Sequence, residues 1–253
     1  MPVAYITGAT SGIGRATAER FIEEGWTVVA MARREERLQE LQDAHPGSVH
    51  CFKLDVRDKA AVEQVFSEAK ERFGAPDVLV NNAGLALGLE PAQACSLDDW
   101  DTMVDTNIKG LLYCTRAALP GMVERRHGSV LNLSSVAAFS AGPRMCLYYA
   151  SKEFVRSFSE AVAEEVRSTG VTVTALCPGP TATGFEQAAQ MKNSHMFSMF
   201  KPASAAAVAE AGFRAAQKGK TLRYCGWPTH TVSIAARLLP RSVCRRFMMK
   251  VNG

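Results

Sequence analysis

The sequence predicts an α/β fold: a single-domain, doubly wound Rossmann fold with a seven-stranded parallel sheet. Three observations lead to this prediction. Short apolar segments alternate with longer amphipathic ones, a glycine-rich turn follows the first apolar segment, and no linker or repeat divides the 253 residues. Strands that alternate with helices form right-handed βαβ units, whose parallel sheet is covered by helices on both faces. We therefore expect residues 1–253 to form one domain.

The individual elements follow from the period of the apolar residues. Short continuous apolar runs predict buried strands at 3–7, 27–32, 49–54, 78–81, 129–133, 171–177 and 222–224. Apolar residues at helical spacing predict helices at 13–24, 35–44, 59–73, 97–125, 148–168 and 203–218. Residues 179–202 show no clear period and are rich in Thr, Ala, Met and Phe, which is typical of a loop over a substrate. Residues 227–253 extend beyond the last strand.

Composition narrows the class of protein. The net charge of +4 is small for this length, so we expect no nucleic-acid partner. Seven scattered cysteines without a C-x-x-C pair indicate a reducing compartment, and five histidines without a ligand motif indicate no metal site. The N-terminus shows no basic leader, and no apolar run approaches the roughly 20 residues that span a bilayer. We expect a cytoplasmic protein.

The turn after the first strand has the character of a phosphate-binding loop. Residues 7–14 read TGATSGIG and open a helix. Gly8 allows a tight turn, Gly12 lets the backbone approach a pyrophosphate, and Gly14 lets helix and sheet pack closely. The glycine spacing differs from the usual G-x-G-x-x-G, and a turn that only joins strand and helix is the alternative. Other members of this turn that we assign to cofactor binding are Thr10, Ser11 and Ile13.

The second strand indicates which dinucleotide binds. An NAD site places an acidic residue at the end of this strand, whereas an NADP site places arginine there to bind the 2′-phosphate. Here Ala32 stands where the acid would be, and Arg33 and Arg34 follow it. The two arginines could alternatively open a charged helix, because Glu35 comes next. We predict NADP(H), with Arg33 the stronger candidate.

Tyr148 and Lys152 form the candidate acid–base pair. They lie four residues apart and so share one face of a helix, whereas Tyr149 points elsewhere. A tyrosine has a pKa of about 10, and a neighbouring ammonium lowers it because the cation favours the phenolate. A packed ring and a solvated lysine are the common alternative for such a pair. The pattern by itself is weak evidence for catalysis.

The assembled motifs resemble the short-chain dehydrogenase/reductase family over nearly the whole chain. The matching segments occur in the family's order, and the ordered set is far more specific than any single motif. They are residues 7–14, Asp55-Val56, Asn81-Asn82-Ala83-Gly84, Asn107, Ser134-Ser135, Tyr148 to Lys152, and Pro178-Gly179 followed by Thr183.

This resemblance implies a role for each matching residue. Tyr148 would be the acid/base, Lys152 would lower its pKa and hold the nicotinamide ribose, and Ser135 would donate to the substrate oxygen. Ser135 is chosen over Ser134 because it precedes Tyr148 by the family's thirteen residues. Asn107 would anchor a proton-relay water. The expected cofactor contacts are Asp55 and Val56 at the adenine, Asn82, Ala83 and Gly84 at the ribose and nicotinamide, and Pro178, Gly179 and Thr183 near the carboxamide.

The sequence indicates the identity of the substrate less clearly than it indicates the cofactor or the catalytic residues. The N-terminal half resembles bacterial NADP-dependent 3-hydroxy acid dehydrogenases of the serine or allo-threonine type, and the C-terminal half departs from them. Ala137, Met145 and Phe185 predict an apolar substrate pocket. Arg144 could pair with a substrate carboxylate, but a solvated loop arginine is the commoner outcome. We therefore expect an NADP-dependent oxidoreductase for a small or medium apolar carbonyl. The alternatives are a 3-hydroxy acid dehydrogenase and a catalytically idle NADP-binding regulatory protein.

The extension at 227–253 carries alternating apolar and basic residues. Such a helix can lie on a membrane surface, but packing on a neighbouring subunit or on the substrate loop is the commoner outcome. Pro240 interrupts the pattern. We expect a homodimer or homotetramer.

Overall fold

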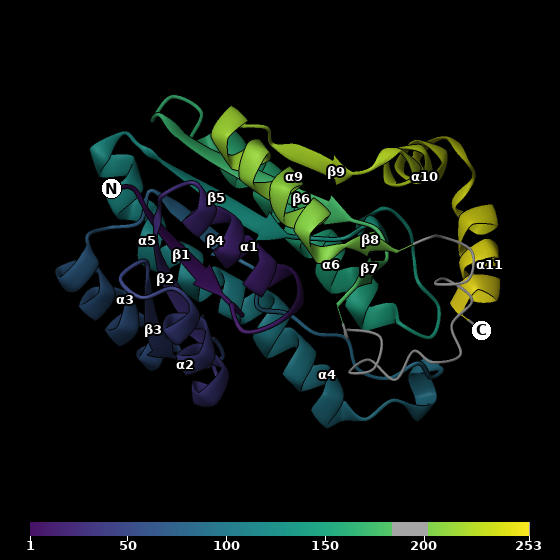
Figure 1. Ribbon diagram of the computed structural model, residues 1–253. Helices are drawn as coiled ribbons and strands as arrows, with labels where there is room; N and C mark the ends of the chain where they lie inside the picture. The colour runs from purple at the N-terminus through teal and green to yellow at the C-terminus, as the bar shows by residue number, and fades with distance from the viewer. Residues whose placement is uncertain (184–201, 253) are drawn as a thin grey trace.

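The computed structural model describes residues 1–183 and 202–252, and its centre is a seven-stranded parallel sheet. The strand order is β3-β2-β1-β4-β5-β6-β9, which confirms the predicted doubly wound fold (Figure 1). The bounds are β1 (Val3–Thr7), β2 (Thr27–Ala32), β3 (Val49–Lys53), β4 (Val78–Asn81), β5 (Gly128–Leu133), β6 (Val171–Pro178) and β9 (Leu222–Cys225). Two short strands, β7 (Thr181–Ala182) and β8 (Ala203–Ser204), pair with each other beside this sheet.

Helices connect the strands and cover both faces of the sheet. They are α1 (Gly12–Glu23), α2 (Glu35–Ala44), α3 (Lys59–Phe73), α4 (Leu97–Val104), α5 (Leu111–Arg125), α6 (Cys146–Glu165), α9 (Ala205–Lys218), α10 (Trp227–Leu238) and α11 (Arg241–Asn252). Short turns of other helix types are η1 (Ala92–Ala94), η2 (Asp105–Gly110) and η3 (Val136–Phe139).

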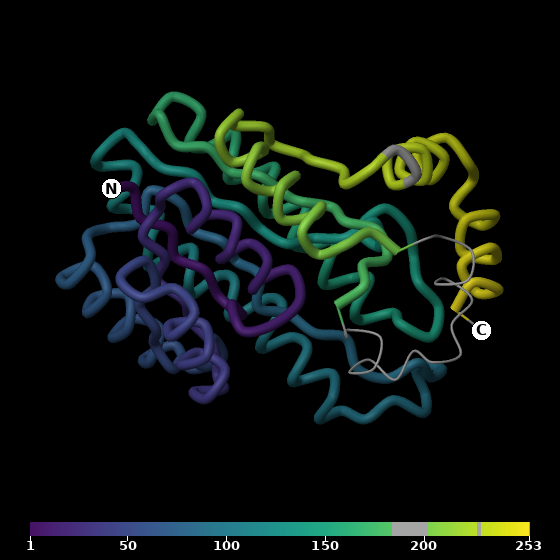
Figure 2. Tube along the Cα trace, viewed as in Figure 1, coloured from purple at the N-terminus to yellow at the C-terminus, as the bar shows by residue number. Residues whose placement is uncertain are grey.

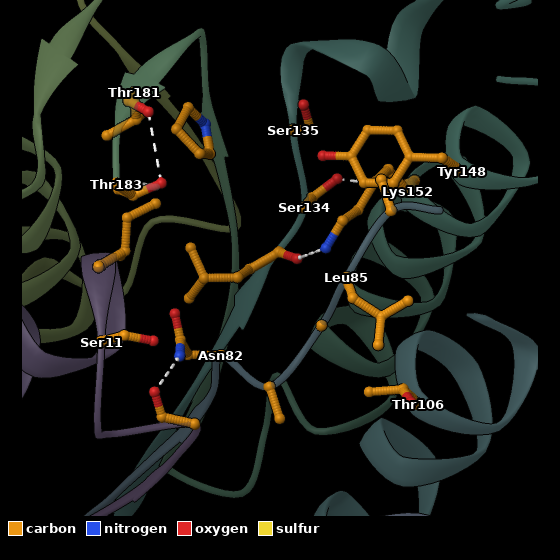
Figure 3. Close-up of a pocket in the computed structure, with 18 of the residues that line it drawn as sticks. Ser11, Asn82, Leu85, Thr106, Ser134, Ser135, Tyr148, Lys152, Thr181 and Thr183 are labelled. Carbon is orange, nitrogen blue, oxygen red and sulfur yellow. Dashed lines mark hydrogen bonds between the residues drawn. The ribbon is translucent and has the colours of Figure 1, made fainter. Parts of the chain in front are cut away.

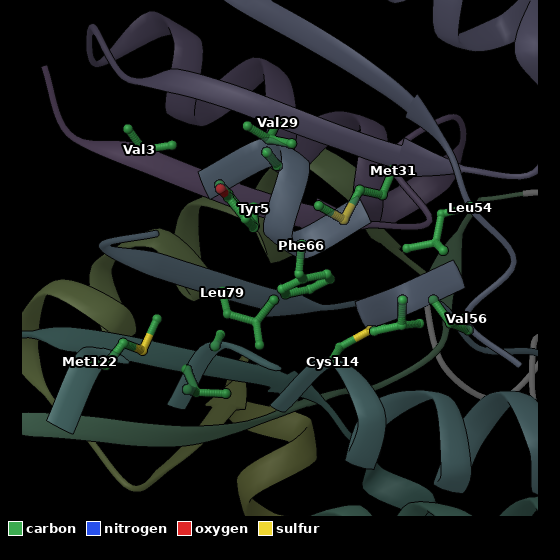
Figure 4. Packing of buried hydrophobic residues seen from close by; sticks show 14 of the residues in the cluster. Val3, Tyr5, Val29, Met31, Leu54, Val56, Phe66, Leu79, Cys114 and Met122 are labelled. Atoms are coloured by element: carbon green, nitrogen blue, oxygen red, sulfur yellow. The ribbon is translucent and has the colours of Figure 1, made fainter. Parts of the chain in front are cut away.

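The alternation of side chains along the strands divides the core between the two faces. In β1, Tyr5 belongs to the cluster that packs under α3, α5 and α6, whereas Ile6 belongs to the cluster under α1, α2 and α9. Successive side chains of a strand point to opposite faces, so one strand serves both clusters. Figure 4 shows the first cluster, where Phe66 of α3 meets Tyr5 edge-to-face. Because both faces of the central strands are buried, β1, β2 and β4 are mainly apolar rather than alternating.

The predicted helix at 97–125 contains a break that its apolar pattern does not indicate. The chain remains helical, but residues Asp105–Gly110 form a π-helical turn between α4 and α5. An extra residue in a helical turn re-aims the side chains there, and such turns are frequent at functional sites. Asn107 lies in this turn and is buried.

The C-terminal extension forms two helices, and Pro240 separates α10 from α11 as the sequence predicts. Figure 2 shows both at the end of the molecule that lies away from the N-terminus. No helix of the described residues is long and apolar enough to span a bilayer.

A chain of buried amides ties the middle of the sheet to the helices beneath it. Asn81 of β4 donates to Asn132 Oδ1 of β5 (2.8 Å) and to Thr115 Oγ1 of α5 (2.9 Å). Asn132 Nδ2 in turn donates to Ser159 Oγ of α6 (2.9 Å). Asn132 is fully buried, so its partners have no access to replacement water.

Replacing Asn132 with Ala should therefore lower the free energy of unfolding by about 2–4 kcal/mol, because Asn81 and Ser159 lose partners inside the core. Denaturant unfolding of the purified protein measures this loss. Thr172→Ala is the matched control: it also removes a side-chain hydrogen bond in the sheet, to Ser129, but at a half-buried position. Equal losses for the two variants would contradict a special role of the buried network.

Candidate active site

A cavity of about 650 Å³ lies at the carboxyl ends of the parallel strands. In open α/β sheets this edge is where ligands bind. The cavity brings together almost all of the residues that the sequence predicts for cofactor and catalysis. Those that line it are Gly8, Thr10, Ser11, Gly12, Ile13, Arg33, Arg34, Asp55, Val56, Asn82, Ala83, Gly84, Ser135, Ala137, Met145, Tyr148, Lys152, Pro178, Gly179 and Thr183.

Four predicted residues do not line it. Arg144 directly precedes Met145 of the cavity wall but is not part of that wall. Gly14 and Asn107 lie behind the wall and act through their neighbours, as described below. Phe185 and the Met- and Phe-rich part of the expected substrate loop lie outside the described residues.

The glycine turn is built for close approach of the backbone. Gly8 has a φ of +67°, and a side chain there would meet Asn82 Nδ2 at 2.8 Å. A Cβ on Gly14 would collide with the carbonyl oxygen of Gly8, so Gly14 permits α1 to begin directly against the turn. Asn82 Nδ2 donates to the carbonyl oxygens of Thr7 (2.9 Å) and Gly8 (3.1 Å) and braces the turn from β4. The sequence predicts Asn82 only as a cofactor contact.

One end of the cavity is cationic. Arg33, Arg34 and Arg37 line it, and Arg34 Nη2 donates to Thr10 Oγ1 and Ser11 Oγ, both at 3.3 Å. Arg37 is absent from the sequence prediction. Its position in the first turn of α2, three residues after the N-cap Arg34, could have indicated it, because a side chain in that turn lies close to the cap.

Asp55 borders this end but is already paired. Burial raises the pKa of its carboxyl, but the hydrogen bonds from Arg57, including Nη2 to Oδ2 at 2.6 Å, outweigh burial and lower it overall. The carboxylate is therefore held next to the arginines in its ionised form.

The other end of the cavity holds the predicted catalytic side chains. Figure 3 shows the hydroxyls of Tyr148 and Ser135 near each other, with Lys152 below the phenol ring. Ser135 begins η3, and its Oγ accepts a hydrogen bond from the backbone nitrogen of Ala137 (3.1 Å). Ser134 Oγ instead donates to the backbone oxygen of Lys152 (2.8 Å). The geometry thus favours Ser135 over Ser134 as the donor to a substrate.

The pKa of Tyr148 is shifted in the direction opposite to the one that the sequence predicts. Burial raises the pKa of Tyr148 to about 12, although a hydrogen bond with Ser135 acts in the opposite direction. Lys152 is not among the groups that lower this pKa: its ammonium donates to the carbonyl oxygen of Leu133 (2.8 Å) and lies over the face of the phenol ring, 5.8 Å from its centre. Burial also lowers the pKa of Lys152 to about 8. At neutral pH the phenol is protonated.

Asn107 connects the π-helical turn to the catalytic helix. Its Nδ2 donates to the carbonyl oxygen of Leu85 (2.8 Å) and to Ser151 Oγ (3.1 Å), and its Oδ1 accepts from the Leu85 nitrogen (2.9 Å). Ser151 Oγ donates to the backbone oxygen of Tyr148 (2.7 Å). In the described structure Asn107 therefore positions the Leu85 wall and α6; its expected role with a relay water stays a prediction.

The C-terminal helix packs behind the end of the cavity that Met145 and Tyr149 line, a contact that the sequence does not predict. Met145 and Tyr149 line the cavity and pack with Met248 of α11. Tyr149 OH donates to Asn252 Oδ1 (3.4 Å), and Asn252 Nδ2 donates to the carbonyl oxygen of Pro143 (2.9 Å). Asn252 is fully buried, so α11 is fastened to the segment that precedes the catalytic helix.

Comparison with known proteins agrees with this geometry. Residues 2–194 match the family model described as short chain dehydrogenase, so the chain belongs to the short-chain dehydrogenase family and is an oxidoreductase. No cluster of three or more metal-binding side chains occurs in the described part of the chain.

Particular relatives are similar over most of both chains. The chain is 47% identical to an NADP-dependent 3-hydroxy acid dehydrogenase of Escherichia coli strain K12, over 70% of this chain and 71% of the relative. It is 48% identical to sulfoacetaldehyde reductase 2 of Chromohalobacter salexigens (72% and 74%) and 46% identical to serine 3-dehydrogenase of Rhizobium radiobacter (71% and 72%). The closed form of a serine dehydrogenase complexed with NADP+ superimposes with a TM-score of 0.83 at 38% identity, covering 88% of this chain and 93% of that one.

The buried ammonium of Lys152 yields a prediction about pH and stability. Its pKa falls from an ordinary 10.5 to about 8 because burial penalises the charge. The cost is therefore fully present below pH 8, where it amounts to about 3 kcal/mol at about 1.36 kcal/mol per pH unit, and it vanishes as the pH rises to 10.5. Lys152→Met should gain stability relative to the wild type at pH 7 and lose that advantage at pH 10.

Thermal unfolding at both pH values measures this difference. The hydrogen bond to Leu133 is lost at either pH, so it cancels in the comparison. Lys218→Met, at an exposed position, is the control and should show no such pH dependence. A constant stability difference between Lys152→Met and the wild type would contradict a buried, destabilised ammonium.

Proposed function

We propose that this protein is an NADP(H)-dependent dehydrogenase that interconverts the hydroxyl group of a small 3-hydroxy acid and the corresponding carbonyl. The observation that carries the proposal is the 46–48% identity to proteins named as 3-hydroxy acid and serine dehydrogenases. This reverses the order of the two substrate classes in the sequence expectation, which placed an apolar carbonyl first.

The residues present suit NADP(H). The turn at residues 8–14 excludes side chains where a pyrophosphate would lie, and the N-terminus of α1 favours its charge. Arg33, Arg34 and Arg37 would bind the 2′-phosphate, and Ala32 offers no carboxylate to repel it. When bound, the nicotinamide supplies or accepts the hydride. Residues proposed for the remaining contacts are Asp55 and Val56 for the adenine, and Asn82, Ala83, Gly84, Lys152, Pro178, Gly179 and Thr183 for the nicotinamide side.

The proton moves through Tyr148 in this proposal. Its raised pKa keeps the phenol protonated at neutral pH, so it can donate to the substrate oxygen as that oxygen gains negative charge during carbonyl reduction. Ser135 would donate a second hydrogen bond to the same oxygen. In the oxidative direction Tyr148 must first lose its proton, which its burial opposes. Tyr148 and Ser135 are hydrogen-bonded to each other, and both would donate to the same substrate oxygen. A protein that only binds NADP(H) has no need of this arrangement, which argues against a catalytically idle binding protein.

A carboxylate on the substrate has a candidate partner in Arg144. This residue directly precedes Met145 of the cavity wall and has a φ of +67°, a strained conformation for a residue other than glycine. Its Nε is buried without a hydrogen-bond partner among the described residues. A buried guanidinium donor that lacks a partner supports an acidic substrate at this end.

An apolar carbonyl compound remains the second candidate, and a specific observation favours it. The substrate end of the cavity is lined by Ala86, Ala137, Met145 and the ring of Tyr149. Such a surface favours apolar groups over a small charged acid.

One assay separates the two. NADP+ reduction with L-serine, L-allo-threonine and 3-hydroxypropionate would be compared with NADPH oxidation by apolar ketones and aldehydes. We expect the hydroxy acids to give the larger kcat/KM, and Arg144→Gln to raise their KM while leaving uncharged substrates unaffected. Strong turnover of the apolar compounds alone would establish the second candidate.

Tyr148→Phe should reduce kcat by about 10²–10⁴-fold with every substrate while NADPH still binds, because the variant lacks only the proton donor.

The cofactor preference depends on the cationic end. Arg33→Ala should raise the KM for NADPH by about 10-fold to 100-fold, because a charge-assisted contact to the 2′-phosphate is removed. The KM for NADH, which lacks that phosphate, should change little and serves as the internal control. Equal effects on both cofactors would contradict the role of Arg33.

A further inference from the structure

The exposed apolar side chains of the described residues are concentrated on the C-terminal helices. Of eight large hydrophobic residues that are exposed, six belong to α10, α11 and their link. The six apolar residues are Ile234, Leu238, Leu239, Val243, Phe247 and Met249. We call these six, together with the basic residues named in the next paragraph, the tail surface. Single exposed apolar residues are ordinary, but their concentration on two successive helices indicates an interaction surface.

Cations accompany these side chains, and acids do not. The basic residues between 227 and 252 are Arg237, Arg241, Arg245, Arg246 and Lys250, whereas the sequence contains no Asp or Glu after Glu210. No ion pair joins any of these five to a carboxylate of the described residues. The tail surface is therefore apolar and uniformly positive.

The spacing in α11 separates two apolar faces. Val251 is buried, and Met248 packs against the cluster that contains Met145 and Tyr149 of the cavity wall. Val243 and Phe247 lie four residues apart on the other face, and about half of each side chain is exposed. The inner face already accounts for the attachment of the helix to the protein, so the outer face needs another explanation.

We infer that the tail surface binds the surface of an anionic lipid bilayer. Exposed apolar side chains flanked by lysine and arginine, without acids, have the composition of a helix that lies in the headgroup region. A second copy of this chain could pair with these cations only through carboxylates from another part of its surface, because the tail surface itself carries none. Negative headgroups provide the missing complement.

This placement connects the membrane to the cavity. The same helix that presents Phe247 outward carries Met248 against Tyr149, and Asn252 holds it to Pro143. A docked bilayer would therefore lie next to the substrate end of the cavity, with one helix between them.

Vesicle co-sedimentation tests the inference. The full-length protein is mixed with vesicles of phosphatidylglycerol and phosphatidylcholine, or of phosphatidylcholine alone. We expect binding to the anionic vesicles only, and its loss at about 0.5 M salt because screening shortens the reach of the charges. Arg245→Glu/Arg246→Glu should weaken partitioning by at least roughly 30-fold, from about fivefold for each cation removed. Leu238→Ser/Phe247→Ser should weaken it while preserving salt sensitivity.

Matched variants control for general changes in charge and surface. Lys218→Glu/Lys220→Glu makes the same charge change at the opposite end of β9, and Leu97→Ser removes an exposed leucine from α4. Both should bind vesicles as the wild type does. Failure of the wild type to sediment with anionic vesicles, or equal loss in the control variants, would overturn the inference. So would a dimer in size-exclusion chromatography with light scattering that the tail variants, but not the controls, dissociate.

Discussion

The attachment of α6 to the end of β5 through Lys152 is the interaction on which the site depends. The ammonium of Lys152 donates to the carbonyl oxygen of Leu133, and its backbone oxygen accepts from Ser134. Two bonds between one residue and the end of one strand fix both the height and the rotation of the helix. Ser135, the next residue along the chain, is thereby placed beside Tyr148, one helical turn from Lys152. The relative placement of the candidate proton donor and its serine partner follows from this junction.

Burying the ammonium of Lys152 at this junction lowers the stability of the folded protein, and interactions elsewhere offset that loss. Burial disfavours the charged forms of both Lys152 and Tyr148, so neither group is placed there for stability. Active sites commonly hold groups in environments that a stable core would avoid. The buried amides of Asn81 and Asn132 and the two apolar clusters on either face of the sheet supply the stability around them. The chemistry is thus confined to one edge of an otherwise ordinary core.

The two ends of the cavity differ in how closely they follow the family. The cationic end is built from segments next to each other in the chain, the turn after β1 and the end of β2, where residues 2–194 match the family model. The other end is lined by η3 and the start of α6, which also lie within that match, but it is backed by α11, which lies beyond it. The C-terminal segment packs behind the pocket and also carries an exposed basic and apolar face. Changes in this one segment can therefore alter both the range of substrates and the surface to which the protein binds. The relatives therefore inform the cofactor more strongly than the substrate.

The sequence by itself determined the fold and predicted most of the residues that line the candidate site, because both rest on local patterns. Buried strands, the glycine turn, Arg33 and Arg34, and the pair Tyr148 and Lys152 are visible as spacing. Contacts between distant segments were decided only by the tertiary structure. No local pattern brings Asn252 to Tyr149, turns Lys152 towards Leu133, or inserts the π-helical turn at Asn107. The tertiary structure also decided that the pKa of Tyr148 is raised rather than lowered. Burial depends on every neighbour in space and not only on the residue four positions along the helix.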